Sequence, residues 1–118
     1  MSRPTDWQLL REGDEHYVGS DTISYRGAAC YIIGIKRPRE RKVRSVYVGH
    51  TDDLLERMRG HATWDGTTGD KIETSTRRGF EVYFSYYIAK DKASAEAIEK
   101  RLLLKWWDYP WNTLGMPF

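Results

Sequence analysis

The stretch ACYIIGIKRPRERKVRSVYVGHTDDLLERMRGH, residues 29–61, decides the fold of this chain. Residues 28–35 form an apolar run rich in β-branched and aromatic side chains, which predicts a strand. Residues 44–49 alternate in polarity, which predicts a second strand with its two valines on one face and Tyr47 on the other. Because only a short polar segment separates them, the two strands are expected to pair as an antiparallel hairpin.

The tip of this hairpin is strongly basic. Between the strands, KRPRERKVR (36–44) holds six basic residues and a single acid, Glu40. Clustered cations of this kind can follow a phosphate backbone, whereas the ordinary alternative is a solvated turn. Arg77 and Arg78 are candidates to extend the same surface. The residues predicted to contact nucleic acid here are Lys36, Arg37, Arg39, Arg41, Lys42 and Arg44.

The remaining elements follow from capping and periodicity. Thr51 can cap a helix in which apolar residues recur at helical spacing as far as Ala62. Residues 63–79, rich in Gly, Thr and Ser, predict a loop with at most one short helical turn, and residues 80–89 predict a third strand. A last helix is expected over 92–107. The predicted fold is α/β in the α+β sense, a small three-stranded antiparallel or mixed sheet flanked by helices in the order β-β-α-loop-β-α.

Composition bounds the class of protein. The 118 residues correspond to one domain, in which we expect residues 1–27 to form a partly helical N-terminal extension and 28–118 the domain proper. The net charge of +2 is too small to indicate a nucleic-acid partner by itself. The only cysteine, Cys30, excludes an intramolecular disulfide and a cysteine-based zinc cage. Without a membrane-length apolar run or a signal-peptide-like start, the expected location is cytoplasmic, with no membrane partner.

Glu99 is the strongest chemical signal in the sequence. It shares one stripe of the last predicted helix with Ala95 and Leu103, at spacings of four residues. A carboxylate within an apolar stripe costs several kcal/mol unless it is paired, protonated or bound to a metal. The ordinary alternatives are a boundary residue that reaches water and a buried partner of an arginine.

A second pattern lies on the first predicted helix. Asp53, Arg57 and His61 are four residues apart and therefore line one face. An exposed ladder of salt bridges is the common outcome of such spacing, and the functional alternative is an arginine that meets phosphate beside a proton-transferring histidine. Tyr31 and Tyr47 lie on the two predicted strands, where packing is the default role of a tyrosine.

Taken together, these residues resemble the GIY-YIG nuclease domain. Tyr31 in ACYIIG stands at the tyrosine of the first family motif, and Tyr47 in VYVGHTDDLLERMRGH stands at that of the second. Arg57 and His61 follow at the spacing typical of the family. Glu99 in ASAEAIEKRLL matches the metal-binding glutamate. Five ordered matches are more specific than any of the short motifs alone.

The resemblance covers residues 28–113 and has two departures. Asn112 in YPWNT matches an asparagine that often closes the domain, and we assign it to nucleic-acid binding. Ala29 and Cys30 replace the glycine and isoleucine of the first motif, and the segment from the first to the second tyrosine is longer than in compact members. The lost motif glycine carries no reacting group.

The resemblance implies a metal-dependent endonuclease that hydrolyses nucleic acid, with DNA expected. Glu99 would hold Mg²⁺ or Mn²⁺, and Arg57 would bind the scissile phosphate. Tyr31, Tyr47 and His61 would share the activation of water, and the sequence leaves open which of them takes the proton. These five residues are the predicted catalytic set.

The sequence leaves three functions open. The first is a nuclease with little sequence preference, since no separate base-reading module is visible. The second is a sequence-specific restriction or homing-type endonuclease, and the third is a non-catalytic nucleic-acid-binding domain of the same fold. The oligomeric state, monomer or homodimer, is open too. Four tryptophans are candidates for stacking on bases or, by default, for the core: Trp64, Trp106, Trp107 and Trp111.

Overall fold

The computed structural model describes residues 4–12, 15–16, 25–64, 66–105 and 109–113. Within them the chain forms strands, three α-helices and a short 3-10 helix. Their bounds are β1 Gln8–Glu12, β2 Glu15–His16, β3 Ala29–Lys36, β4 Arg44–Thr51, α1 Leu54–Ala62, α2 Gly66–Arg77, β5 Glu81–Ile88, α3 Lys92–Lys105 and η1 Pro110–Thr113. No helix in these described residues is long and apolar enough to cross a membrane.

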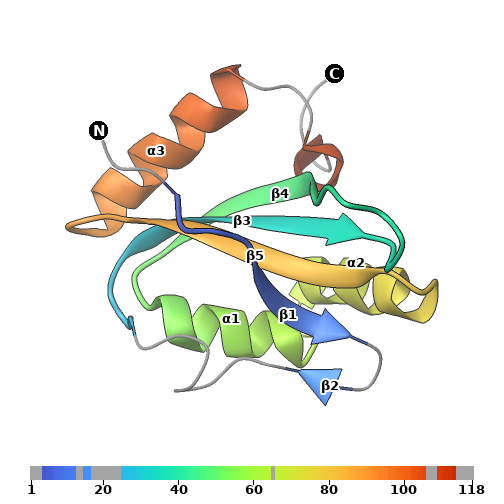
Figure 1. Cartoon of the computed structure of the whole chain (residues 1–118). Helices are drawn as coiled ribbons and strands as arrows, with labels where there is room; N and C mark the ends of the chain where they lie inside the picture. Colours follow the sequence, from blue (N-terminus) through green and yellow to red (C-terminus); the bar gives the residue numbers. More distant parts are fainter. Residues whose placement is uncertain (1–3, 13–14, 17–24, 65, 106–108, 114–118) are drawn as a thin grey trace.

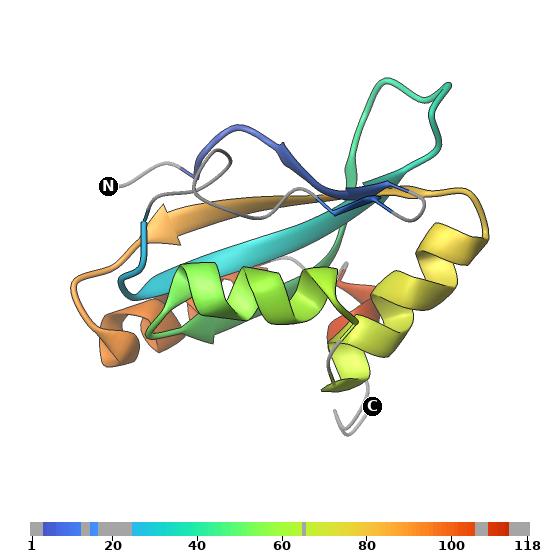
Figure 2. The same cartoon turned by 90° about the horizontal axis from the view of Figure 1, so that it is seen from below.

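The strands form one antiparallel sheet in the order β2-β1-β5-β3-β4. Helix α3 covers one face of the sheet, and α1 and α2 cover the other (Figure 1). Seen from below, α1 and α2 lie end to end across their face (Figure 2). One core cluster therefore lies between the sheet and α1 and α2, and a smaller one lies under α3. The predicted α+β architecture and the hairpin of β3 and β4 are confirmed, but the prediction of three strands is wrong, because β1 and β2 join the sheet as well.

The prediction of a partly helical N-terminal extension is wrong over the described residues, because β1 and β2 are strands of the sheet. β1 pairs with β5, with Gln8 opposite Phe84, and Leu10 is fully buried in the core. Just before β1, the backbone N–H of Thr5 donates to the carbonyl of Tyr86 at 2.9 Å. The N-terminal segment thus pairs with the edge of β5 that would otherwise be free. This pairing outweighs the segment's own secondary-structure propensity.

The loop predicted for residues 63–79 is mostly helix α2. Its threonine hydroxyls find hydrogen-bond acceptors within the helix. The hydroxyl of Thr76, for example, donates to the carbonyl of Ile72 at 2.8 Å. Ile72 and Thr76 are both buried, so packing against the core stabilises a helix of poor intrinsic propensity. Gly69 is needed for close approach, because a Cβ at this position would lie 2.2 Å from the carbonyl carbon of Trp64.

A bulge in β4 corrects the predicted alternation of its side chains. Tyr47 lies opposite Ile33, but the next pair joins Ser45 to Gly34, so Val46 is the extra residue. Val46 packs with the core beneath α1 and α2, whereas Val48 packs under α3. The two valines therefore lie on opposite faces, and Tyr47 lies on the α1 face together with Val46.

The outer edge of β4 is closed by the side chain of Asn112 in η1. Its Oδ1 accepts the backbone N–H of Val48 at 2.7 Å, and its Nδ2 donates to the carbonyl of Val48 at 2.8 Å. The amide thus takes the place of one residue of a neighbouring strand, which satisfies the open edge of the sheet. This contact ties η1 to the strand that carries Tyr47.

Candidate active site

The site is built around the contact of Tyr31 in β3 with Gly49 in β4. The two residues are directly opposite in the sheet, and Tyr31 is buried. A Cβ at position 49 would lie 2.6 Å from the hydroxyl oxygen of Tyr31 and 2.9 Å from Cε2 of Tyr47. A side chain at position 49 would collide with the Tyr31 hydroxyl. Glycine leaves the space that this hydroxyl occupies across β4.

Three of the predicted catalytic side chains form one aromatic cluster. The hydroxyl of Tyr31 is hydrogen-bonded to Nε2 of His61 at 2.9 Å. The ring centroid of Tyr47 lies 6.1 Å from that of Tyr31 and 6.4 Å from that of His61. Tyr47 is half-buried, so it is the tyrosine with access to solvent. Strands β3 and β4 and helix α1 each supply one member.

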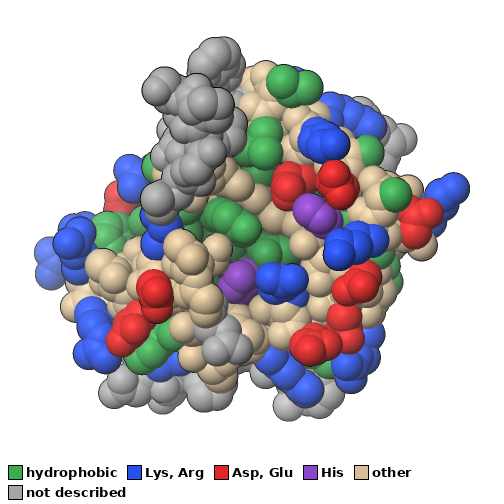
Figure 3. Space-filling model, turned by 180° about the vertical axis from the view of Figure 1, so that it is seen from behind, with side chains coloured by type: hydrophobic (Ala, Val, Ile, Leu, Met, Phe, Trp, Pro, Cys, Tyr) green, Lys and Arg blue, Asp and Glu red, His purple; other side chains and the backbone are tan. Residues whose placement is uncertain are grey.

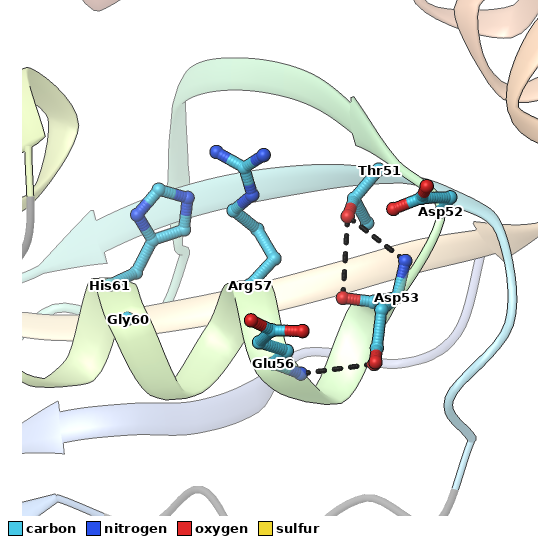
Figure 4. Close-up of a pocket in the computed structure, with 7 residues that line it drawn as sticks. All are labelled: Thr51, Asp52, Asp53, Glu56, Arg57, Gly60 and His61. Carbon is cyan, nitrogen blue, oxygen red and sulfur yellow. Dashed lines mark hydrogen bonds between the residues drawn. The ribbon is translucent and has the colours of Figure 1, made fainter.

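Helix α1 presents Arg57 beside His61, as the spacing predicted. Both side chains rise from the same side of the helix (Figure 4). The expected salt-bridge ladder is absent, because Asp53 forms its ion pair with Arg26 at 3.0 Å. Asp53, and not Thr51, is the N-cap of α1. Arg57 is exposed and has no ion pair within the described part of the chain, which suits it to bind an incoming anion.

The side chains of Arg57 and His61 line a cleft of about 310 Å³. It is bounded by the end of β4 and by one side of α1 (Figure 4). Its size suits a small polar group such as a phosphate diester with its attacking water. The lining residues are Thr51, Asp52, Asp53, Glu56, Arg57, Gly60 and His61.

Electrostatics keep the buried members of this cluster neutral. Burial, reinforced by the positive charge of Arg57, lowers the pKa of His61 to about 4. Burial raises the pKa of Tyr31 well above its ordinary value, Tyr47 adds to the effect and Arg57 opposes it. The pKa of Cys30 is also raised by burial, to about 12. At neutral pH the imidazole of His61 is therefore neutral and the thiol of Cys30 is protonated.

Glu99 lies on α3 and is paired with a histidine that the sequence analysis missed. Nδ1 of His50 lies 3.1 Å and 3.0 Å from the two carboxylate oxygens of Glu99. The side chain of Glu99 is only 16% exposed, and its charge raises the pKa values of Tyr31 and Cys30. Glu99 is therefore neither a free boundary residue nor the partner of an arginine.

The sequence did hold a signal for His50, since it follows the motif glycine directly. In the sheet it is opposite Cys30, so strand alternation sends it to the α3 face while Tyr31 goes to the α1 face. Figure 3 shows histidine surface at two places on one side of the molecule, one beside acidic and the other beside basic side chains.

Glu99 suits a hard cation that keeps most of its waters. Among the described residues, no group of three His, Cys, Asp or Glu side chains converges as a metal site. Mg²⁺ is commonly held by one or two carboxylates together with waters and substrate phosphate, and does not need a cage of protein ligands. A single, half-buried carboxylate such as that of Glu99 fits this requirement.

The hairpin tip lies apart from this cluster, at the far end of β3 and β4. Lys36 pairs with Glu81 at 2.7 Å, and the guanidinium of Arg37 lies over the ring of Phe80 at 4.5 Å. These two cations are therefore partly engaged by the protein. The exposed cations at the tip are Arg37, Arg39, Arg41, Lys42 and Arg44.

Two of the four candidate stacking residues lie within the described residues. The ring of Trp64 packs against the core, with the guanidinium of Arg11 3.7 Å from its centroid. Trp111 lines a polar groove of about 350 Å³ beside α2, together with Lys71 and Arg78. Trp64 is thus a packing residue. Of these two described tryptophans, Trp111 is the one that lines a polar groove and stays a candidate for stacking on bases. The other two candidates, Trp106 and Trp107, lie outside the described residues.

Two comparisons relate this chain to known proteins. The family profile described as "GIY-YIG catalytic domain" matches residues 28–106. Among solved structures, a mutant of bacteriophage T4 EndoII is similar with a TM-score of 0.62 and 19% sequence identity, over 94% of this chain and 90% of that one. At this identity the likeness concerns the fold. No curated protein sequence matches the chain.

The depressed pKa of His61 predicts a pH dependence of stability. Between pH 6.5 and 4 the unfolded chain binds a proton at this histidine and the folded protein does not, so the free energy of unfolding falls as pH falls. The contribution lost is roughly 3 kcal/mol across this window. From urea denaturation, the free energies of unfolding of the parent and of His61→Gln should change relative to each other by this amount, with the parent losing stability as pH falls. Parallel changes with pH would show that His61 is not held neutral.

Proposed function

The chain belongs to the GIY-YIG family, and on this premise we propose that it is a metal-dependent endonuclease that hydrolyses DNA with little sequence specificity. The observation that carries the proposal is that Tyr31, Tyr47 and His61 form one cluster, and that His61 and Arg57 line one cleft. Glu99 lies close enough for its charge to act on Tyr31.

Arg57 binds the scissile phosphate. Its guanidinium is exposed at the cleft, and its planar fork can donate to two phosphoryl oxygens at once, which a lysine cannot reproduce. Charge that develops on these oxygens during hydrolysis is stabilised by the same contact. The bound anion also offsets the positive charge that helps to depress the pKa of His61.

The hydrogen bond between Tyr31 and His61 supports a route for the proton of the attacking water. The water gives a proton to the hydroxyl oxygen of Tyr31 while the tyrosine passes its own proton to Nε2 of His61. A tyrosine whose pKa is raised is a poor base alone, so the neutral imidazole is the final acceptor. Tyr47, half-buried beside Tyr31 and His61, orients the water.

Glu99 would hold the Mg²⁺ or Mn²⁺ ion through a carboxylate oxygen. When bound, such an ion polarises the phosphoryl group and stabilises the leaving oxygen. The protein contributes a half-buried carboxylate whose position is fixed by α3.

Low sequence specificity is proposed because the described residues form a single sheet with its flanking helices, without an appended base-reading module. A restriction or homing-type enzyme would need base contacts from the basic hairpin or from a second copy of the chain. A non-catalytic binding domain is disfavoured by the presence of all five predicted catalytic residues. Digestion of defined duplexes separates the first two possibilities.

Cleavage itself provides the first test. We expect the purified protein to cut labelled DNA with Mg²⁺ and not with a chelator, and Glu99→Gln to remove cutting while DNA binding in chelator stays intact. Single-stranded, duplex and branched DNA and RNA are compared side by side by gel electrophoresis. Glu96→Gln, three residues away on the same helix, is the matched control and should cut normally. A folded Glu99→Gln protein that still cuts would exclude the metal assignment.

The basic hairpin predicts the salt dependence of binding. Neutralising Arg39, Arg41 and Lys42 to glutamine should reduce the slope of log affinity against log salt by up to about three, because fewer counterions are released. Fluorescence anisotropy in chelator measures binding without cleavage. The control removes three exposed cations next to or on α3, namely Lys90, Lys92 and Lys105. Equal slopes for the parent and the hairpin variant would rule out a hairpin contact.

A further inference from the structure

His50 contacts the carboxylate of Glu99 at hydrogen-bonding distance through Nδ1. Its other ring nitrogen, Nε2, lies 3.7 Å from Glu96, which is beyond a hydrogen bond. Glu96 also pairs with Lys100 at 3.3 Å, one helical turn along. The imidazole therefore lies between two carboxylates of α3 but is hydrogen-bonded to only one of them.

The backbone around His50 determines which way its ring points. β4 is an edge strand, and the bulge at Val46 comes before Val48, Gly49 and His50. Beyond the bulge, regular alternation leaves Gly49 beneath Tyr31 and turns His50 toward α3. The same short segment of β4 therefore serves the tyrosine cluster on one face and the glutamate on the other.

We propose that His50 is a positioning residue for Glu99. Its Nδ1–H donates to the carboxylate and holds the long, flexible glutamate in one rotamer, which limits the ordering entropy that metal binding would otherwise cost. An ionised carboxylate has about four acceptor positions, so this contact leaves others for a metal ion and its waters. The inference rests on the proposed function, because it concerns the metal-holding role of Glu99.

A carboxylate site of this kind is sensitive to its outer contacts. Loss of a group that orients a ligand typically weakens metal affinity by roughly 10- to 100-fold. The effect should be large here, because no group of three His, Cys, Asp or Glu side chains among the described residues could hold the ion instead. Glu96 has no such role, since it lies outside hydrogen-bonding distance of the ring.

Two substitutions separate the two nitrogens of His50. In His50→Asn the side-chain amide nitrogen can take the place of Nδ1, so the contact with Glu99 is kept. In His50→Gln the amide reaches instead toward the position of Nε2 and Glu96. Mn²⁺ is the probe, and its affinity for the full chain without DNA is measured from the electron paramagnetic resonance signal of the free ion. Circular dichroism confirms that each variant is folded.

We expect His50→Asn and Glu96→Gln to bind Mn²⁺ nearly as well as the parent, and His50→Gln to bind roughly 10- to 100-fold more weakly. In cleavage assays, His50→Gln should need correspondingly more Mg²⁺ and regain most of its rate at saturation. Equal affinity of all variants would overturn the positioning role. Nitrogen coupling from an imidazole to bound Mn²⁺ would overturn it as well, because His50 would then be a direct ligand. A parent protein that binds no Mn²⁺ and shows no metal-dependent cleavage would contradict the proposed function itself.

Discussion

The register of β3 against β4 is the constraint on which the site depends. It places the ring of Tyr31 over Gly49, at the one position where β4 has no side chain. The hydroxyl can therefore lie across β4 and meet His61 of α1 at 2.9 Å. A shift of one residue would put a valine or a histidine beneath the ring and turn Tyr31 to the wrong face. The bulge at Val46 preserves this register while the strand continues to the hairpin tip.

The sheet edge also joins two chemically different halves of the site. On the α1 face the side chains are aromatic and kept neutral by burial, and Arg57 supplies the positive charge. On the α3 face Glu99 is held by a hydrogen bond to His50. Burial is the main cause of the lowered pKa of His61 and the charge of Arg57 adds to it, so an anion bound to Arg57 would offset the second cause. In the proposed mechanism, phosphate binding and water activation are coupled through this charge.

The parts of this arrangement that could be predicted are those fixed by local pattern. Alternation and helical spacing indicated β3, β4, α1 and the shared face of Arg57 and His61. What could not be predicted depends on tertiary contacts. The N-terminal segment becomes a strand because β5 has a free edge, and α2 forms on a Thr-rich sequence because Ile72 is buried. The His50 contact needs both the bulge and the docking of α3, and Asn112 turns out to satisfy the edge of β4.

The most direct test of this account is the substitution Gly49→Ala, assayed for DNA cleavage and for the ring signals of His61 by nuclear magnetic resonance. The added methyl group would displace the Tyr31 hydroxyl, and misplacement by about 1 Å can cost about 100-fold in rate. The account predicts a folded protein that still binds Mn²⁺ and DNA, cleaves about 100-fold more slowly, and shows shifted His61 resonances. A folded Gly49→Ala protein with the parent's cleavage rate and unchanged His61 signals would contradict it.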